Sequence, residues 1–508
     1  MTKKLTEPLF MIFILALALR WIGSTHGFPF IFHPDEPTIV REALNLRFTR
    51  NPGHFDWPHL YMYLNYFLFM FFAKLRDLAA VQGLKPYLSA NIPILWNDNL
   101  VFYLLARLLS GFFGALTVIP VYYTGKVLFD KKTAIISAFI FSVLPFHVWH
   151  SHYSMGDVPM VFFIALNMYF SAKIFKENEA KNYLLAGLSI GLASSVKYNA
   201  VLLCLTVPLA HIFRILNDRK EKFFNFDTLM NLVFSGLCAI AGFVAGTPYA
   251  VMDYKTFLIS DSPKGALWQF VNVGSVDSSQ RFTKFFTEMV HRVSDDVGYV
   301  VLAAFFIVLA VLLYKLAVRK FSKKDYTLWY LVIPPFISLV YVSGFDSTRS
   351  HYYMIAYPFL AVVYAYIVCY FSSLVKKSYM IEFFSVVLLI FPLFYFSVIK
   401  TYIFAREDTR NVLFSWANQH VDLNTPIISG NDEYIYMVLS SKYKNIYKGY
   451  SSYSISPFGL GYLVVAVSDE SPKQAFERFT YLPKLNLVYS INNTYRRGPF
   501  INIYEYRK

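Results

Sequence analysis

Residues 296–317, DVGYVVLAAFFIVLAVLLYKLA, decide the fold of this chain. From Val300 to Leu313 the stretch contains no charged residue, and an apolar helix of about 20 residues crosses about 30 Å of hydrocarbon. A group of lysines and arginines follows at 315–324. An apolar helix that ends in basic residues is typical of a membrane span whose basic end faces the cytoplasm. The stretch therefore predicts an integral membrane protein.

The composition of the whole chain agrees with this prediction. Of its 508 residues, 56% are hydrophobic and only 16% are charged, whereas soluble domains have about 25% charged residues. These values exclude a disordered chain, a fibrous protein and an ordinary cytosolic enzyme. We attribute the net charge of +15 to loops at an anionic membrane surface and not to nucleic-acid binding. We expect eleven transmembrane helices, at about 8–26, 102–125, 133–149, 157–175, 182–196, 199–216, 229–249, 296–317, 327–343, 353–375 and 381–403.

A shorter run at 60–73, LYMYLNYFLFMFFA, either crosses the membrane or lies flat at its surface. If the run lies flat, nineteen basic residues of the short loops share the cytoplasmic face. If it crosses, all but the first group move to the outer face, which contradicts the positive-inside rule. We therefore predict an interfacial helix and a cytoplasmic N-terminus. The basic residues are Lys3, Lys4, Lys126, Lys131, Lys132, Lys173, Lys176, Lys181, Arg214, Arg219, Lys220, Lys222, Lys315, Arg319, Lys320, Lys323, Lys324, Lys376 and Lys377.

The polar composition after about residue 405 predicts a second domain. We expect a transmembrane domain at 1–404, with outer loops 27–101 and 250–295, and a small α/β domain at 405–508 on the outer face. The first apolar run is interpreted as an uncleaved helix, because no small-residue cleavage site precedes Arg20-Trp21. Arg410 and Trp416 are attributed to packing of a helix onto the bundle. The predicted elements of the small domain are helices at 409–420 and 472–480 and strands at 426–429, 461–467, 485–490 and 500–505.

Three carboxylates are expected together on the outer face. Asp35 and Glu36 lie in HPDEP directly after the first span, and Asp157 lies in HSHYSMGD before the fourth. Each has a simpler explanation, because acidic residues in a first turn complement the helix dipole and Asp157 could cap its helix. Adjacent carboxylates at a membrane surface are nevertheless costly unless they are used or solvated. We therefore treat the three as candidate catalytic residues.

Cationic and aromatic side chains are expected on the same face. Lys197 lies in SSVKYN, and Arg349, His351 and Tyr352 lie in STRSHYY. Lys197 at the turn of an apolar hairpin could simply reach the headgroups. The alternative is a clamp for a phosphate group near the membrane surface. His59, Tyr61 and His152 are further candidate substrate-binding residues; His150 and His152 would share one side of an extended segment, but two ligands do not make a metal site.

The order of these motifs resembles that of a known family. Over about residues 8–403 the chain is similar to the polyprenyl-phosphate-sugar-dependent glycosyltransferases of the GT-C superfamily. More narrowly, it resembles glycosyltransferase family 39, the protein O-mannosyltransferases, and the aminoarabinose transferase of lipid A. The family usually has a second proline where His59 stands. The matching segments are HPDEP (33–37), WPHLYMYL (57–64), ARL (106–108), MGDVPMVFF (155–163), KY (197–198), GTPY (246–249) and the stretch from Arg349 to Pro358.

The resemblance implies a GT-C helical bundle and an inverting sugar transfer on the extracytoplasmic face of a cell membrane. Asp35 would be the general base for an acceptor hydroxyl, and Glu36 and Asp157 would assist it. Lys197, Arg349 and His351 would stabilise the leaving phosphate. The donor would be a sugar on a polyprenyl phosphate, and the acceptor a lipid, a glycan or a protein. No metal cofactor would be required, because the leaving group is a lipid monophosphate.

Three other functions remain open on the sequence alone. A flippase or transporter of lipid-linked sugars would have ionisable residues near the middle of spans and internal repeats. A transferase that uses a diphosphate carrier would share the helical bundle but depend on loop cations or a metal. A non-catalytic membrane scaffold would use the outer domain for binding. Few charges lie in the middle of the predicted spans, which favours a transferase.

Overall fold

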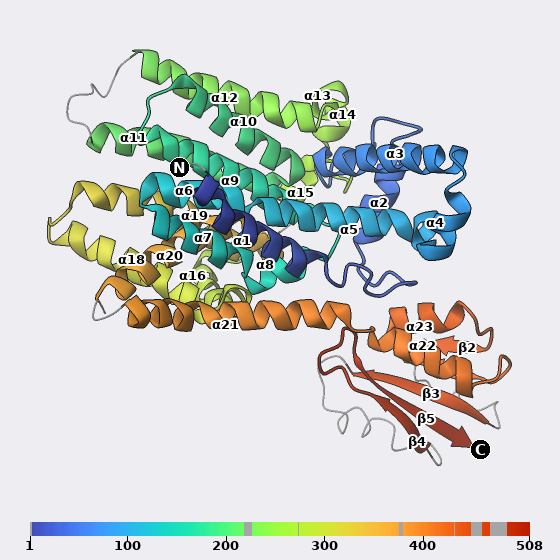
Figure 1. Cartoon of the computed structure of the whole chain (residues 1–508). Coiled ribbons are helices and arrows are strands. Elements are labelled where there is room, and N and C mark those ends of the chain that lie inside the picture. The colour runs from blue at the N-terminus through green and yellow to red at the C-terminus, as the bar shows by residue number, and fades with distance from the viewer. Residues whose placement is uncertain are drawn as a thin grey trace. The chain divides into compact units, whose positions relative to one another are not determined.

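The computed structural model describes residues 3–217, 226–272, 274–374, 379–430, 432–448, 460–467 and 485–507. These residues are mostly helical, with a small mixed sheet near the C-terminus (Figure 1). They form two compact units. The first comprises Met1–Trp21 and Asp35–Lys400, and the second comprises Ile22–Pro34 and Thr401–Lys508. The second unit thus includes residues 27–34, which the sequence assigned to an outer loop of the transmembrane domain.

The first unit is helical, and each of the eleven predicted apolar runs contains helix. The helices that fall in these runs are α1 (Lys3–Trp21), α5 (Asp98–Leu116), α6 (Val118–Leu128), α7 (Lys131–Ser142), α8 (Pro145–His150), α9 (Asp157–Ile174), α10 (Ala180–Val196), η2 (Tyr198–Leu205), α11 (Thr206–Asn217), α12 (Phe226–Gly246), α18 (Tyr299–Ala317), α19 (Lys323–Ser343), η4 (Ser350–Ala356), α20 (Tyr357–Leu374) and α21 (Tyr379–Ala405).

Eight ranges of the described residues are long and apolar enough to cross a membrane. These ranges confirm the prediction of a mostly helical chain with several candidate spans. The predicted number of eleven transmembrane helices stays a prediction. Two of the other helices, α7 and α10, have only 12 and 17 residues; Pro145 begins a separate helix after α7. The eight ranges are Asp98–Leu128, Asp157–Ile174, Tyr198–Asn217, Leu229–Gly246, Tyr299–Ala317, Asp325–Ser343, Ser350–Leu374 and Phe383–His420.

The predicted interfacial run lies in α3 (Leu60–Val81), which follows α2 (Glu36–Asn45) and precedes α4 (Lys85–Asn91) and η1 (Pro93–Trp96). Helix α3 is not among the eight candidate spans, because Lys74, Arg76 and Asp77 lower the hydropathy of its second half. Its flat orientation stays a prediction. Some of the basic residues used to predict this orientation lie outside the described residues. They are Arg219, Lys220, Lys222, Lys376 and Lys377.

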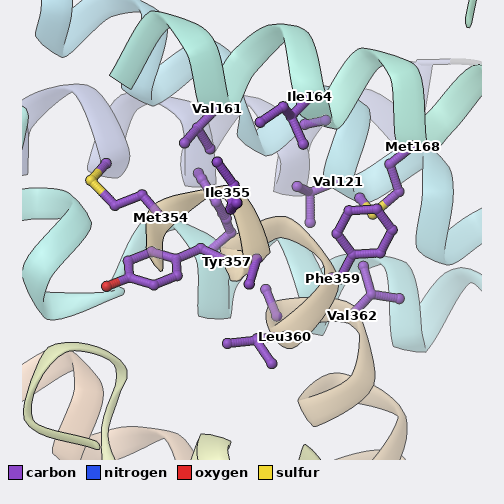
Figure 2. Packing of buried hydrophobic residues seen from close by; sticks show 14 of the residues in the cluster. Val121, Val161, Ile164, Met168, Met354, Ile355, Tyr357, Phe359, Leu360 and Val362 are labelled. Atoms are coloured by element: carbon purple, nitrogen blue, oxygen red, sulfur yellow. The ribbon is translucent and has the colours of Figure 1, made fainter. Parts of the chain in front are cut away.

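The core of the first unit surrounds α9 and α20. Val161, Ile164 and Met168 of α9 pack against the chain around Ile355 and Phe359 (Figure 2). Both helices are apolar on all sides, as expected for helices surrounded by other helices. By contrast, α12 and α21 are largely exposed in the unit. Exposed apolar helices at the outside of the bundle are what a lipid environment requires.

The remaining elements of the first unit come from outer loop 250–295. They are α13 (Tyr249–Met252), α14 (Tyr254–Phe257), α15 (Ala266–Asn272), α16 (Ser278–Thr287), η3 (Glu288–Val293) and α17 (Ser294–Val297).

Helices α10 and α12 approach each other through glycine. A Cβ atom added at Gly187 or Gly191 would overlap the backbone carbonyl of Ser235 or Ala239 in α12. A Cβ atom at Gly242 would lie 2.7 Å from the carbonyl oxygen of Leu188. Small residues let membrane helices pack with their backbones in contact. These glycines therefore set the distance between the two helices.

Substituting Gly191 tests this packing. We expect Gly191→Ala to destabilise the protein by about 1–3 kcal/mol, because the backbones must separate to admit the methyl group. Gly236→Ala in α12 is the matched control, because a Cβ atom there has no neighbour within 4 Å. The control should leave stability unchanged or raise it by up to about 1 kcal/mol. Thermal melting of the purified variants measures both, and equal melting temperatures would contradict the account.

The second unit contains a five-stranded mixed sheet with the order β2-β1-β3-β5-β4. β1 (Ile427–Ser429) pairs in parallel with β2 (Ile446–Lys448) and β3 (Leu460–Val467), whereas β5 (Phe500–Arg507) pairs antiparallel with β3 and with β4 (Leu485–Ile491). The four predicted strands and the helix α22 (Thr409–His420) are confirmed. β2 and the helix α23 (Glu433–Ser440) were not predicted, and the predicted helix 472–480 lies outside the described residues.

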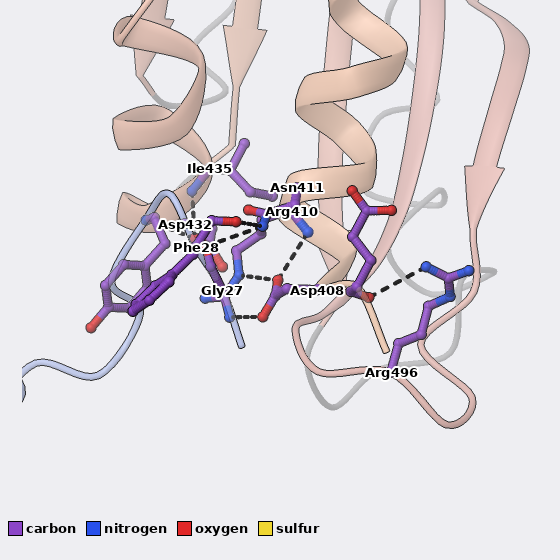
Figure 3. A network of polar contacts seen from close by, with 10 residues as sticks. Gly27, Phe28, Asp408, Arg410, Asn411, Asp432, Ile435 and Arg496 are labelled. Atoms are coloured by element: carbon purple, nitrogen blue, oxygen red, sulfur yellow. Dashed lines mark hydrogen bonds and ion pairs between the residues drawn. The ribbon is translucent and has the colours of Figure 1, made fainter. Parts of the chain in front are cut away.

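A polar network ties residues 27–28 to α22 (Figure 3). The Asp408 carboxylate caps the helix and forms two hydrogen bonds of 2.8 Å with the Arg410 guanidinium. The Asn411 amide donates hydrogen bonds to the carbonyls of Gly27, at 3.1 Å, and Phe28, at 2.8 Å. Arg410 lies 3.7 Å above the Phe32 ring. Arg410, which the sequence attributed to packing on the bundle, thus has these contacts within the second unit.

Candidate active site

Asp35 lies at the start of α2. It is the N-cap residue of this helix, and a proline occupies the first turn, as the sequence predicted for a helix start. The Asp35 side chain is half-buried and makes no capping hydrogen bond to the helix backbone. The carboxylate is therefore not used as a helix cap.

Glu36 is occupied by a buried ion pair. Its two carboxylate oxygens accept hydrogen bonds from Nε and Nη2 of Arg107 in α5, both at 2.8 Å, and both side chains are at most 1% exposed. The backbone N–H of Ser154 donates to Glu36 Oε1 at 2.9 Å. A buried carboxylate is stable only with partners of this kind.

The ion pair connects three sequence motifs. Glu36 belongs to HPDEP, Arg107 to ARL, and Ser154 lies three residues before Asp157 in the MGD segment. Glu36 therefore holds the start of α2 against the turn that begins α9. This contact brings the neighbourhood of Asp35 to the segment that carries Asp157.

Asp157 forms the centre of a second cluster. It is 1% exposed, and its Oδ1 is ion-paired with Lys197 Nζ. Its Oδ2 lies 3.3 Å from His150 Nε2. A short helix, α8, presents the histidine, the first turn of α9 presents the aspartate, and the residue after α10 presents the lysine. The turn of the apolar hairpin thus delivers Lys197 to Asp157 and not simply to the membrane surface.

The STRSHYY segment completes this cluster. The His351 ring stacks on the His150 ring, with centroids 5.3 Å apart, and Lys197 Nζ lies 5.2 Å from the centroid of the Tyr352 ring. Arg349 precedes the helix η4 and is exposed. Asp157 and His150 are buried behind Lys197, His351 and Tyr352, which are half-buried. The cluster therefore offers cations and a histidine on its accessible side.

The histidine that contacts Asp157 is His150 and not His152. The sequence placed both histidines on one side of an extended segment, which is wrong, because α8 starts at Pro145 and continues to His150. His152 is buried, and its Nδ1 lies 2.9 Å from the Val148 carbonyl oxygen. The signal that could have identified His150 is Pro145, which starts the short helix that ends at this histidine.

His59 and Tyr61 anchor the start of α3. The backbone N–H of His59 donates to Thr247 Oγ1 at 3.2 Å, and its Nε2 lies 2.8 Å from the His54 carbonyl oxygen. Burial lowers the pKa of His59 to about 4, so this ring is neutral at ordinary pH. Tyr61 donates from its hydroxyl to the Ala106 carbonyl at 3.1 Å. Both side chains are buried. The His59 N–H links the WPHLYMYL segment to GTPY, and the Tyr61 hydroxyl links it to ARL.

An apolar cavity is connected through ring contacts to the cluster around Asp157 and Lys197. Its volume is about 1010 Å³, and α16, α18 and α19 supply most of its lining, much of it phenylalanine, with Arg281 among the lining residues. Phe345 of this lining contacts Tyr352, with ring centroids 6.5 Å apart. Tyr352 in turn contacts Lys197. A continuous path of contacts therefore leads from an apolar cavity to a charged cluster.

Metal ligands do not gather in the parts of the chain that the structure describes: no group of three His, Cys, Asp or Glu side chains there could hold a metal ion. Cys204, Cys238 and Cys369 are free thiols.

Part of the chain matches the sequence model of a known family. Residues 66–251 match the sequence model of the family described as dolichyl-phosphate-mannose-protein mannosyltransferase. This part of the chain is similar to that family. The match includes Asp157 and Lys197, and the predicted resemblance is confirmed over these residues. The chain is a multi-pass membrane protein.

One curated relative is dolichyl-phosphate-mannose–protein mannosyltransferase 1 of Saccharomyces cerevisiae, 31% identical over 156 residues. The alignment covers 29% of this chain and spans only 18% of the yeast protein. The crystal structure of apo ArnT from Cupriavidus metallidurans has a TM-score of 0.51 at 10% identity and covers 97% of both chains. That likeness shows that the two chains share a fold. The Archaeoglobus fulgidus oligosaccharyltransferase has a TM-score of 0.49 at 13% identity, covering 89% of this chain and 64% of the other.

Proposed function

We propose that this protein transfers a sugar from a polyprenyl phosphate to an acceptor hydroxyl on the extracytoplasmic face of the membrane. The observation that carries the proposal is the contact path from the apolar cavity through Phe345 and Tyr352 to Lys197. A lipid-linked phosphate needs an apolar site for its tail and, next to that site, cations for its phosphate group. The family matched over residues 66–251 is described by a dolichyl-phosphate sugar, which supports a monophosphate carrier.

The donor phosphate would lie at Lys197 and Arg349. Asp157 fixes Lys197 on one side, and the Tyr352 ring contacts it on the other. A lysine held in this way offers a preorganised positive charge, which stabilises the negative charge that develops on a leaving phosphate. His351 stacks on buried His150. Asp157 is thus a positioning residue in this proposal, because its carboxylate is already paired.

Asp35 would be the general base. Glu36 is held by Arg107, and Asp157 by Lys197. Of the three candidate carboxylates, Asp35 is the half-buried one, whereas Glu36 and Asp157 are buried. Glu36 would position Asp35 through its contact with Ser154. His59, Tyr61 and His152 would shape the site from behind, because their side chains are buried.

The reaction then needs two coordinated events. Asp35 accepts the proton of the acceptor hydroxyl while the hydroxyl oxygen forms a bond to the anomeric carbon. The bond from that carbon to the phosphate oxygen breaks on the opposite side, so the configuration inverts. Polyprenyl phosphate leaves with the bonding electrons, and Lys197 and Arg349 balance its added charge. No step uses a metal ion, and we propose that the reaction does not require one.

Radiolabelled donors test the proposed function. The protein in lipid nanodiscs, supplied with polyprenyl-phosphate sugars and membrane acceptors, should form labelled product and release polyprenyl phosphate. The rate should be unchanged by EDTA. Turnover of a polyprenyl-diphosphate sugar in place of the monophosphate would refute the monophosphate carrier. Movement of intact donor across vesicles without hydrolysis of its phosphate bond would identify a flippase instead.

Changing Lys197 tests the anion site. Lys197→Ala should lower kcat/KM for the donor by about 100- to 1000-fold, because the charge that balances the leaving phosphate is lost. Lys197→Arg keeps the charge and should retain most of the activity. Melting temperatures establish that both variants are folded. Unchanged kcat/KM in folded Lys197→Ala would remove this residue from the donor site.

A further inference from the structure

A second pocket lies in the C-terminal unit, between α22 and the sheet. Its volume is about 540 Å³. The chemically informative residues of its lining are Ser415, Trp416, Gln419, His420, Tyr462 and Tyr489. The pocket lies entirely within the second unit, so it is separate from the proposed active site. Its lining combines aromatic rings with neutral polar groups.

Trp416 holds the aromatic rings of this pocket together. The His420 ring is stacked on it at 5.0 Å, with an interplanar angle of 10°, and the Tyr489 ring at 5.9 Å, with an angle of 7°. Tyr462 meets the indole edge-on at 5.6 Å. His420 is fixed further, because its Nδ1 lies 2.8 Å from the Trp416 carbonyl oxygen. The rings therefore form a rigid aromatic platform.

The sheet register explains why two tyrosines from different strands meet the same tryptophan. β5 lies between β3 and β4. Tyr462 is opposite Glu505 of β5, and Tyr489 is opposite Ile503. Residues two apart on a strand point to the same face, so both tyrosines lie on the face that α22 covers.

Core packing accounts for only part of this platform. Trp416 and Tyr462 are partly buried against the hydrophobic cluster of the unit. Tyr489, however, is 41% exposed on the edge strand β4, and Gln419 and His420 are exposed on the last turn of α22. Stacked rings beside an amide and a hydroxyl, left open at the surface, are typical of a ligand site.

We propose that this pocket binds a neutral saccharide. A sugar ring has apolar C–H faces that pack on aromatic rings and hydroxyl groups at its edge that need hydrogen-bond partners. The Tyr489 and His420 rings supply the first, and Ser415 and Gln419 supply the second. None of the described lining residues is Asp, Glu, Lys or Arg, so the lining favours an uncharged hexose chain over a phosphate or a charged peptide. The proposal does not depend on the transferase activity.

Binding can be measured on the full chain without any donor. The protein is placed in lipid nanodiscs free of glycoside detergent, because a maltoside headgroup would compete for the pocket. Mannohexaose, maltohexaose and chitohexaose are each examined by saturation-transfer difference NMR. We expect at least one to bind, with the dissociation constant below about 10 mM that is usual for weak recognition. Absence of saturation transfer from all three would overturn the proposal.

Variants assign the binding to the pocket. Tyr489→Ala and Gln419→Ala should each weaken binding, with a loss of about tenfold for Tyr489→Ala, whereas Tyr489→Phe should retain it because the ring is kept. Tyr436→Ala is the matched control: Tyr436 is a 37% exposed tyrosine of α23 and does not line the pocket. Equal affinities in wild type, Tyr489→Ala and Gln419→Ala would place the saccharide elsewhere and overturn the proposal.

Discussion

Replacing Asp35 with asparagine will abolish sugar transfer while the protein still accumulates in the membrane. Asparagine has nearly the same shape but accepts no proton, and removing a general base costs a factor of about 100 to 10,000 in rate. The Asp35 side chain is half-buried and does not cap α2, so the fold should not depend on its charge. The measurement is the rate of product formation from radiolabelled donor, with melting temperature as the check on folding.

The matched control for this variant is Glu42→Gln. Glu42 lies on the same helix, α2, and its carboxylate lies 3.8 Å from His54 Nε2, outside both clusters described above. We expect its transfer rate to stay within about twofold of wild type, because the pair is long and partly open to solvent, and such pairs contribute little. If Asp35→Asn keeps full activity, or if both variants lose it equally, Asp35 is not the base.

The second large effect concerns the buried pair Glu36–Arg107. In Arg107→Leu the Glu36 carboxylate stays buried but loses the guanidinium. Of the partners described above, the Ser154 N–H remains. Removing one member of a buried ion pair costs about 3–5 kcal/mol, which is a large part of the stability of a typical domain. We expect little folded protein, or a melting temperature many degrees lower. Size-exclusion chromatography and thermal melting measure the two outcomes.

A double substitution distinguishes an uncompensated charge from a lost contact. Glu36→Met combined with Arg107→Leu removes both charges, and well-packed apolar residues often replace a buried ion pair without loss of stability. The double variant should therefore be more stable than Arg107→Leu alone. A single variant as stable as wild type would show that the pair does not hold α2 to α5. The transfer rate of the folded double variant then reports how far Glu36 positions Asp35.

The sequence predicted the helical bundle because long apolar runs have few alternatives in a membrane. It also predicted the start of α9 at Asp157 and the position of Lys197 at the end of α10, because both residues interrupt apolar runs at their ends. Four of the five described strands at the C-terminus could be predicted from their alternation. These are local features, and local patterns are sufficient for them.

Contacts between distant residues could not be predicted in this way. Glu36 and Arg107 are 71 residues apart, and each has an ordinary local explanation, as a first-turn acid and as a cation near the end of a span. The choice of His150 over His152 depends on α8, which is only six residues long. The assignment of Ile22–Pro34 to the second unit depends on Asn411 and Arg410, almost 400 residues away.

One measurement tests the central claim most directly: a cryo-electron microscopy structure of the full chain with bound polyprenyl phosphate. The account predicts the phosphate within about 3 Å of Lys197 Nζ and of the Arg349 guanidinium, the distance of a charge-assisted hydrogen bond. It also predicts the start of the polyprenyl tail beside Phe345 in the apolar cavity. A phosphate bound away from Lys197 and Arg349, with the cavity next to Phe345 empty of lipid, would contradict the account.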